Sequence, residues 1–401
     1  MKLSLQQKHL IVNRRSFQNF KVKVSVYFFL LIIVCHTIHR LFLGKMETDQ
    51  RLKLAQQSIN SKNKKLINLV DNKTVFEEKI NKFKESLKPN QDLKPSEDES
   101  NSPGNDISVC VRIRPMLDYE NQADYFQTVL NNHPKVQVAE PKFTVRGESK
   151  IIPSTYNVDF SFGPKNSTQD IYECVAEPVI QMGLQGGVST IFAYGQTASG
   201  KTFTISGILD ALIHDLMTQK EEHIELYISV FEILGNECKD LIGLNEQKVE
   251  IMEDKLNKVN VTNVQMTKIE SIDACKDMIK DALKNRQSAT TFKNDSSSRS
   301  HAIFSFKVKN LKHKSIDDGQ IFVIDLAGSE NAADSQFHDK TRIKETQAIN
   351  KSLMALKDCI RNRALSVMNM DKYYHVPYRL SKLTLLLKVI YIKTLSLFLF
   401  V

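Results

Sequence analysis

Apolar and polar positions alternate in two different periods along most of this chain. Short runs rich in β-branched and aromatic residues predict strands at 107–113, 188–194, 225–234, 301–309 and 320–327. Helix-like segments separate these runs, the clearest being QDIYECVAEPVIQMGL. Strands that alternate with helices predict an α/β fold, in which a central sheet is covered by helices.

The region upstream of the first strand is polar, with one amphipathic patch. In VFEEKINKFKESL the apolar residues approximate helical spacing, and Pro89 ends the predicted helix. The next stretch, PSEDESNSPGND, has the composition of a flexible linker, so ordered structure is expected to restart at Ile107. The apolar positions of this helix are Val75, Phe76, Ile80, Phe83 and Leu87.

The N-terminal 1–45 region contains a more continuous apolar run, Val24–Val34. It has the profile of a signal-peptide apolar region or a short membrane anchor. The run is short for a span, Arg40 follows closely, and no small-residue cleavage pattern is present. We therefore favour a dispensable leader over a membrane role, with Met46 as a second candidate start.

Charge and cysteine content narrow the choice of partner and compartment. Lys and Arg (55) exceed Asp and Glu (46), and the net charge of +9 favours an acidic partner, whether nucleic acid, an anionic membrane or an acidic protein surface. The six cysteines form no CxxC pair, so neither a zinc site nor a disulfide framework is supported, and a reducing intracellular compartment is expected.

A phosphate-binding loop follows the apolar strand at 188–194. GQTASGKT fits the GxxxxGK[ST] pattern, in which backbone N–H groups surround phosphate oxygens. Lys201 can reach the β- and γ-phosphates and the Thr202 hydroxyl can ligate Mg²⁺, while the alternative is a Gly-rich turn without a ligand. The candidate nucleotide-binding residues are Gly195, Gln196, Thr197, Ala198, Ser199, Gly200, Lys201, Thr202 and Phe203.

Two further segments suit the same site. QIFVIDLAGSE places Asp325 at a strand end, where a carboxylate can hold the Mg²⁺ shell through water, and Gly328 can sense a γ-phosphate. NDSSSRSH precedes another strand; a Ser-rich loop is often only solvated, but Ser297 and Ser298 are suited to metal and water. Arg299 can pair with Glu330 to close the site.

Together these three segments resemble the phosphate loop and two switches of the kinesin motor family. Further similarities are VCVRIRP, FSFGPKNSTQDIYE, INKSLMAL and HVPYRLSKLT, and the resemblance covers about residues 106–388. It implies a P-loop fold with a mostly parallel central sheet, ATP and Mg²⁺ as cofactors, and microtubules as partner rather than nucleic acid. It also implies that Arg112, Arg114 and Pro115 flank the adenine, and that Ser297, Ser298, Arg299, Gly328 and Glu330 are catalytic.

Within that family the chain looks most like the kinesin-13 class, which depolymerises microtubules from an internal motor, or its centriolar relatives. LKDCIR is similar to the sequence that such proteins carry on their tubulin-binding helix, and the helix at 75–87 looks like their neck, although a generic solvated helix fits it equally well. The Lys-Val-Asp loop tip of that class has no literal counterpart near Val145. The implied tubulin contacts are Lys357, Asp358, Cys359, Arg361, Arg379 and Lys382.

The C-terminal sequence departs from the family pattern after SKLTLLLK. The apolar tail at 389–401 either leaves the core truncated or substitutes for a missing strand. We therefore divide the chain into a leader (1–45), a neck and linker (46–105), a motor domain (106–388) and a tail. Two hypotheses follow. One is a microtubule-stimulated ATPase of the cytoplasmic cytoskeleton, at spindle, centriole or cilium; the other is a truncated, non-hydrolysing protein that binds microtubules or tubulin. A homodimer is an open possibility.

Overall fold

The computed structural model describes most of the chain downstream of residue 106 and one helix upstream of it. The described residues fall into two compact units. The larger lies within Ser167–Phe400, and the smaller contains the upstream helix together with Val109–Asn166. The described ranges are 72–87, 107–122, 126–243, 248–288, 299–312, 318–329, 340–368, 373–393 and 397–400.

The larger unit is built on a central sheet with the strand order β11-β7-β12-β13-β6-β14, and β8 pairs with β7. β13 and β14 run parallel to β6, whereas β12 runs antiparallel to both β7 and β13. The α/β prediction is confirmed, but the predicted mostly parallel sheet is wrong because the sheet is mixed. The strands are β6 (Val188–Ala193), β7 (Ile224–Leu234), β8 (Glu237–Asp240), β11 (Thr267–Lys268), β12 (His301–Asn310), β13 (Gly319–Asp325) and β14 (Leu397–Phe400).

The antiparallel strands have a simple cause. The chain passes from the end of β12 to the start of β13 in a short connection, and a short connection can only reverse the chain direction. A parallel neighbour would need a crossover of a dozen residues or more. That condition is met between β6 and β13, where several helices and strands intervene.

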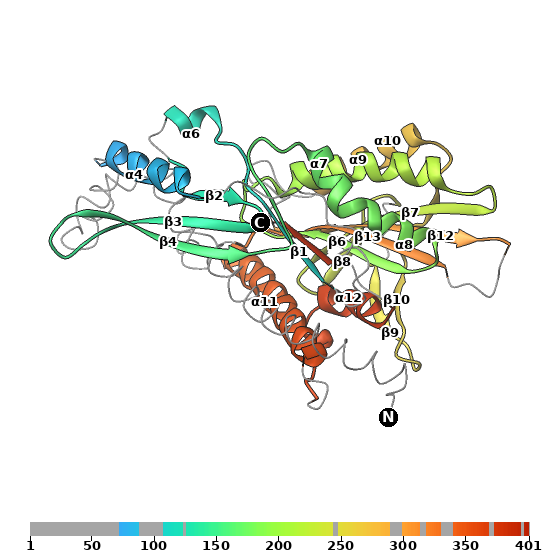
Figure 1. Ribbon diagram of the computed structural model, residues 1–401. Helices are drawn as coiled ribbons and strands as arrows, with labels where there is room; N and C mark the ends of the chain where they lie inside the picture. Colours follow the sequence, from blue (N-terminus) through green and yellow to red (C-terminus); the bar gives the residue numbers. More distant parts are fainter. Residues whose placement is uncertain are drawn as a thin grey trace, which may run out of the picture. The chain divides into compact units, whose positions relative to one another are not determined.

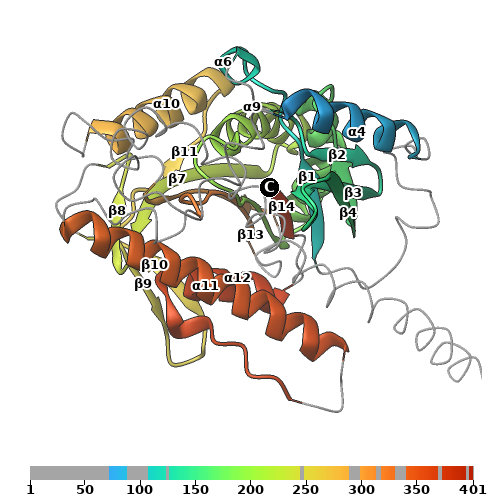
Figure 2. The same ribbon diagram turned by 90° about the vertical axis from the view of Figure 1, so that its left-hand side faces the viewer.

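Helices cover both faces of this sheet. α9 and α10 lie on one face, and α11 and α12 lie on the other (Figure 1, Figure 2). α9 buries Ile205, Ile208, Leu212 and Leu216, whose spacing forms one apolar stripe. The helices are α7 (Thr168–Ile171), a π-helical turn (Tyr172–Ala176), α8 (Glu177–Leu184), α9 (Lys201–Gln219), α10 (Ile272–Ser288), α11 (Lys340–Met368), the 3-10 turn η4 (Tyr378–Leu380) and α12 (Lys382–Lys393).

The C-terminal tail takes part in the central sheet. α12 continues to Lys393, and Leu397–Phe400 then forms β14, which pairs with the phosphate-loop strand β6 from Leu397 opposite Thr190 to Phe400 opposite Ala193. Of the two alternatives for this tail, the structure therefore supports a strand that fills a place in the sheet.

A separate hairpin packs against α12. Its strands are β9 (Glu250–Glu253) and β10 (Val259–Thr262), and both contact α12. Glu253 accepts hydrogen bonds from Arg379 and Lys388, so ion pairs hold the hairpin to α12 and to the turn before it.

The smaller unit has its own sheet and core. A three-stranded antiparallel sheet packs with a parallel pair of strands, and the upstream helix α4 (Lys73–Glu85) contacts β4. The remaining elements are β1 (Ser108–Arg112), α6 (Asp118–Gln122), β2 (Val129–Asn132), β3 (Lys135–Phe143), β4 (Ser149–Asn157) and β5 (Phe160–Phe162).

The helix predicted near 75–87 is confirmed and is packed rather than solvated. Phe76 is fully buried, stacks on Phe126 and meets Phe143 edge-on at a ring-centroid distance of 5.2 Å. Ile80 is also buried, whereas Val75 is 38% exposed and does not belong to the apolar face as predicted.

None of the helices within the described ranges is both long and apolar enough to cross a membrane. The apolar run Val24–Val34 lies outside those ranges.

Candidate nucleotide site

The predicted phosphate loop lies between a buried strand and a helix, as its pattern requires. All six residues of β6 are buried, and α9 begins at Lys201, directly after the loop. Gly200 has φ 94° and Ala198 has φ 62°, so the backbone turns through left-handed conformations at both positions. This geometry turns the N–H groups and the positive end of α9 toward the space where phosphates would lie.

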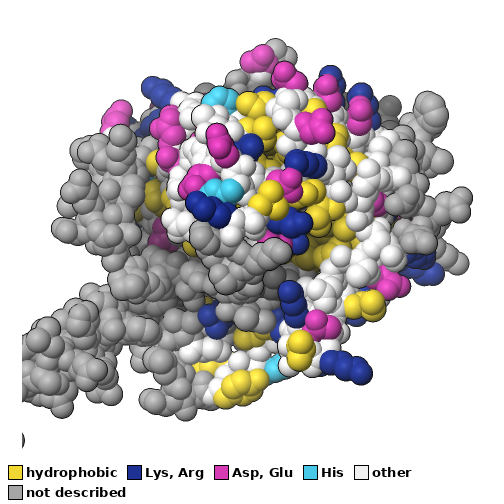
Figure 3. All heavy atoms as spheres, turned by 90° about the vertical axis from the view of Figure 1, so that its right-hand side faces the viewer, with side chains coloured by type: hydrophobic (Ala, Val, Ile, Leu, Met, Phe, Trp, Pro, Cys, Tyr) yellow, Lys and Arg dark blue, Asp and Glu magenta, His cyan; other side chains and the backbone are white. Residues whose placement is uncertain are grey.

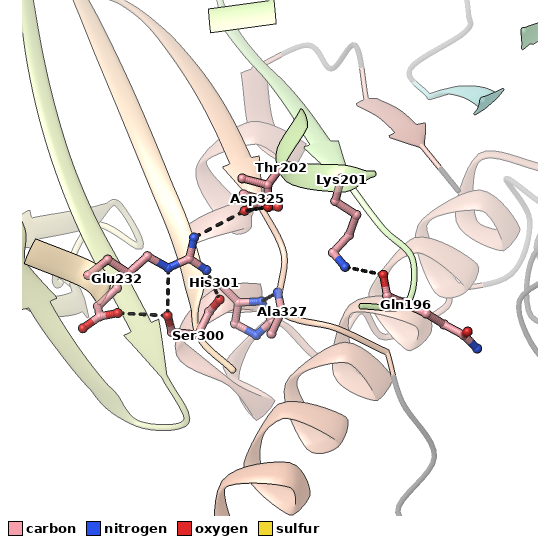
Figure 4. Close-up of polar contacts among 9 residues, drawn as sticks. Gln196, Lys201, Thr202, Glu232, Ser300, His301, Asp325 and Ala327 are labelled. Atoms are coloured by element: carbon pink, nitrogen blue, oxygen red, sulfur yellow. Dashed lines mark hydrogen bonds and ion pairs between the residues drawn. The ribbon is translucent and has the colours of Figure 1, made fainter. Parts of the chain in front are cut away.

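Lys201 is folded back over this loop. Its side chain is 9% exposed, and its Nζ donates a hydrogen bond to the Gln196 carbonyl oxygen at 2.7 Å (Figure 4). The ammonium is thus held at the loop itself, where it can neutralise phosphate charge.

Asp325 and Thr202 meet at the predicted metal position. The Thr202 hydroxyl donates to Asp325 Oδ2 at 2.9 Å although the residues are 123 positions apart in sequence (Figure 4). Asp325 Oδ1 is buried without a hydrogen-bond partner in the described structure, and so is Ser199 Oγ. An unpartnered buried carboxylate oxygen beside a hydroxyl fits a hydrated Mg²⁺, which prefers oxygen ligands.

A buried arginine that the sequence did not single out supports Asp325. Arg286, on α10, is 1% exposed and places its Nη1 3.3 Å from Asp325 Oδ2. Its guanidinium also donates to the Ser300 carbonyl oxygen at 2.6 Å and to Ser300 Oγ at 3.1 Å. Ser300 Oγ in turn donates to Glu232 Oε2 at 2.9 Å, so a connected polar network lies behind the metal position.

The spacing on α10 contained a signal for this arginine. Cys275, Ile279 and Ala282 are buried, and Arg286 continues their helical spacing. An arginine on the apolar face of a helix requires a buried partner, and Asp325 provides it.

His301 lies next to this network and is fully enclosed. Its Nδ1 accepts a hydrogen bond from the Ala327 N–H at 3.0 Å, and its Nε2 lies 2.8 Å from Ser352 Oγ on α11. Burial, together with the nearby charges of Arg286 and Lys201, lowers the pKa of His301 to about 3. The imidazole is therefore neutral at physiological pH.

The switch segments are described only in part. Ser297, Ser298 and Glu330 lie outside the described residues, so their predicted roles and the Arg299–Glu330 pair remain predictions. Arg299 itself pairs with Glu345 on α11 at 3.3 Å. Gly328 is buried, and the N–H of the following Ser329 donates to the Gly195 carbonyl oxygen at 3.2 Å, which joins the second switch to the phosphate loop.

Phe203, a predicted nucleotide-binding residue, lies in the larger unit, whereas the predicted adenine contacts Arg112, Arg114 and Pro115 lie in the smaller unit. Phe203 is in the first turn of α9 and is 68% exposed. In the smaller unit, Arg114 binds the Glu120 carboxylate with both terminal nitrogens, at 2.7 and 2.5 Å. This pair raises the pKa of Arg114 and lowers that of Glu120. Arg114 Nη1 also donates to the Pro115 carbonyl oxygen at 3.0 Å, so Arg114 holds the loop that carries Pro115. The roles of Arg112, Arg114 and Pro115 at adenine stay predictions.

The predicted tubulin contacts on α11 are only partly accessible. Lys357, Asp358 and Arg361 are partly exposed, and the Lys357 ammonium lies 5.3 Å from the centre of the Tyr194 ring. Cys359 is 1% exposed and faces the core, and burial with the nearby Asp358 charge raises the pKa of its thiol to about 12. Cys359 is therefore wrong as a contact residue in this structure.

The two candidates after α11 differ in exposure. Arg379 has a side chain that is 77% exposed and bound to Glu253, whereas Lys382 Nζ donates to the Ile251 carbonyl oxygen at 2.8 Å. Lys382 thus holds the β9–β10 hairpin in place. Among the side chains of α11 whose burial is described, the exposed ones are Lys344, Gln347, Lys351 and Met354.

Basic side chains form no separate patch among the described residues on the face shown in Figure 3. On the face shown in Figure 3, Lys and Arg side chains are interspersed with Asp and Glu among the described residues. The positive net charge therefore does not by itself locate a binding surface.

Comparison with known proteins agrees with the geometry of the site. A family model described as the kinesin motor domain matches residues 112–400. Diatom spindle kinesin-1 from Cylindrotheca fusiformis is 36% identical over 296 residues, which are 72% of this chain and 45% of that protein. Kinesin-like protein KIF24 from Homo sapiens is 33% identical over 294 residues, 70% of this chain and 21% of that protein. The chain thus spans less than half the length of these relatives.

A solved structure is also similar to this chain in its fold. The structure named "KIF14[391-755] - ADP in complex with a microtubule" matches with a TM-score of 0.61 and 26% identity, covering 73% of this chain and 88% of that one.

Proposed function

Because this chain belongs to the kinesin motor-domain family, we propose that it hydrolyses ATP and that binding to microtubules stimulates the hydrolysis. The observation that carries the proposal is the meeting of Thr202 and Asp325, with one buried Asp325 oxygen left unpartnered. Kinesin-family membership supports the microtubule as partner, and the KIF14 structure is one bound to ADP and a microtubule. The proposed location is the microtubule cytoskeleton.

Each residue of the site has a defined task in this proposal. The phosphate loop and Lys201 bind and orient the phosphates, and Thr202 with Asp325 would hold Mg²⁺, which supplies charge neutralisation at the phosphate oxygens. Phe203 would stack on the base. Ser297 and Ser298 would place the attacking water, and Arg299 with Glu330 would close the site during hydrolysis.

Phosphate release measured with and without microtubules tests the proposal. Hydrolysis that rises when microtubules are added is the expected result. Microtubule binding without any hydrolysis would instead support the alternative of a non-hydrolysing tubulin-binding protein.

The outward face of α11 is the proposed microtubule contact. Lys351 is exposed on this helix and Arg361 is partly exposed two to three turns further along it, so both can meet the acidic tubulin surface. We expect the double variant Lys351→Ala/Arg361→Ala to weaken microtubule affinity by about three- to tenfold at low salt, since exposed ion pairs each contribute up to about 1 kcal/mol. Cosedimentation with microtubules measures this change.

The matched control removes two positive charges from the opposite face of the sheet. Lys220 follows α9 and Lys276 lies on α10, so Lys220→Ala/Lys276→Ala should leave microtubule affinity unchanged. The loss in the α11 variant should also shrink as salt rises to physiological levels, where the Debye length is about 8 Å. An equal loss in both double variants would show that net charge, and not α11, drives binding.

The kinesin-13 assignment is the finer part of the proposal. Lys357, Asp358 and Arg361 support it, whereas Cys359 no longer does because it is buried. Fluorescence microscopy of microtubules with ATP decides the class: shortening from the ends supports kinesin-13. Steady gliding without shortening would refute the class and leave the kinesin function in place.

A further inference from the structure

His301, the first residue of β12, and Arg299, two residues before it, hold α11 by side-chain contacts. His301 Nε2 lies 2.8 Å from Ser352 Oγ, and Arg299 Nη1 lies 3.3 Å from Glu345 Oε2. Glu345 and Ser352 are seven positions apart, which places them on the same face of the helix two turns from each other. α11 is therefore joined at two successive points to the start of β12 and to the residue two positions before it.

The bond between His301 and Ser352 has a fixed direction. The Ser352 hydroxyl donates to the Ile349 carbonyl oxygen at 2.7 Å, so it must accept from His301 Nε2–H. On the other side of the ring, Nδ1 accepts from the Ala327 N–H at 3.0 Å. Both ring nitrogens are thus used, each in one role, and the imidazole bridges the end of the second-switch strand and α11.

His301 is also joined to the metal position from both sides. Ser300, the preceding residue, binds Arg286, which pairs with Asp325. Ala327, which donates to the ring, lies two residues after Asp325. A shift of Asp325 or of the backbone that follows it therefore has a short path to the imidazole, as the labelled residues in Figure 4 show.

We propose that His301 is a positioning residue that transmits nucleotide-dependent movement of the phosphate site to α11 through Ser352. This inference rests on the proposed function, because α11 is the helix that would bind the microtubule. The path from the phosphate site to α11 passes through side-chain contacts and does not run along the backbone between Ser329 and the start of α11 at Lys340. In this proposal, β12, the strand that follows the first switch, positions the microtubule-binding helix α11 in addition to the second switch.

An ordinary buried histidine would make the same bonds for stability alone, so the test must separate coupling from folding. Ser352→Ala removes the acceptor on α11 and leaves His301 bound to Ala327. His301→Asn retains an amide oxygen near the position of Nδ1 but cannot reach Ser352. Ser366→Ala is the matched control, because it removes another hydroxyl of α11, one that binds Asn362 and Tyr374 carbonyl oxygens away from the switches.

Two readouts are measured in each variant: phosphate release with and without microtubules, and cosedimentation with microtubules in ADP and in a non-hydrolysable ATP analogue. We expect Ser352→Ala to keep the basal phosphate release of the unmodified chain. The factor by which microtubules stimulate phosphate release should fall about five- to tenfold. The ratio of microtubule affinities in the two nucleotides should fall by a similar factor. The double variant His301→Asn/Ser352→Ala should lose no more stimulation than Ser352→Ala, because both changes break one link.

Three outcomes would overturn the inference. The first is full stimulation and an unchanged affinity ratio in Ser352→Ala. The second is an equal fall of basal and stimulated rates, which would assign the pair to stability only. The third is an unmodified chain that shows neither stimulation nor nucleotide-dependent binding, and in that case the proposed function fails together with the inference.

Discussion

Replacing Lys201 with alanine is expected to reduce microtubule-stimulated phosphate release on the order of 10²- to 10³-fold. Lys201 is the cation that the structure holds at the phosphate loop, with its Nζ 2.7 Å from the Gln196 carbonyl oxygen and only 9% of its surface exposed. Charge that develops on the transferring phosphoryl group in a partly buried site is stabilised strongly by a fixed donor, and loss of one such donor has an effect of this size. Phosphate release with saturating microtubules is the measurement.

The control for this variant lies at the other end of the same helix. Lys220 caps α9 and is remote from the loop, so Lys220→Ala should keep at least half of the stimulated rate. Binding of a fluorescent ATP analogue, measured in parallel, shows whether Lys201→Ala acts on affinity, on turnover or on both. Undiminished turnover in Lys201→Ala would remove the phosphate loop as the site of hydrolysis.

The parts of the site that were predictable from sequence are those in which one short segment contains both the reactive residues and the strand or helix that positions them. The phosphate loop is such a segment, because the apolar strand before it and the helix after it are both readable from local pattern. Asp325 was predicted from the strand that precedes it. Its place beside Thr202 was predicted from the chemistry of the two segments, since both suit the same Mg²⁺, whereas no spacing in the sequence indicates the direct hydrogen bond between them.

The buried partners of these residues could not be predicted in the same way. The contacts of Arg286 with Asp325 and of His301 with Ser352 depend on how α10 and α11 pack on opposite faces of the sheet. Each pair joins segments that are dozens of residues apart, so local periodicity indicates at most that one member is buried. The direction of β12 was missed for a related reason, because strand pairing is a property of the whole sheet.

Cys359 is an error that periodicity alone could have prevented. It follows Leu356 by three positions on α11, and both are buried. Residues three and four apart share a helix face, so the same spacing places Cys359 inward, while Met354 is exposed. A motif borrowed from a family must therefore be checked against the helical phase of the chain that carries it.

Replacing Arg286 with alanine is expected to give the largest loss of stability. Arg286 and Asp325 are both almost fully buried, and removal of one member of such a pair leaves an uncompensated charge that costs about 3–5 kcal/mol. For a domain of this size that corresponds to a fall of roughly 10 °C in Tm. Thermal unfolding followed by circular dichroism measures it.

Lys284→Ala is the matched control for this change. Lys284 lies on the same helix, two residues before Arg286, and its pair with Asp281 at 2.7 Å is exposed to solvent. Such a pair contributes up to about 1 kcal/mol, so the control should unfold within a few degrees of the unmodified chain. Equal Tm values for Arg286→Ala and the unmodified chain would mean that the buried ion pair does not form.

The same variant also tests where the metal lies, because among the described residues the Thr202 hydroxyl would then be the one side-chain partner left to Asp325. A divalent cation bound near the free Asp325 oxygen would supply the positive charge that Arg286 no longer provides. The rise in Tm on adding Mg²⁺ and ADP, compared with ADP and a chelator, should therefore be larger in Arg286→Ala than in the unmodified chain. Lys284→Ala should match the unmodified chain in this comparison. Equal Mg²⁺-dependent rises in all three proteins would place the metal away from Asp325 and leave the carboxylate with a purely structural role.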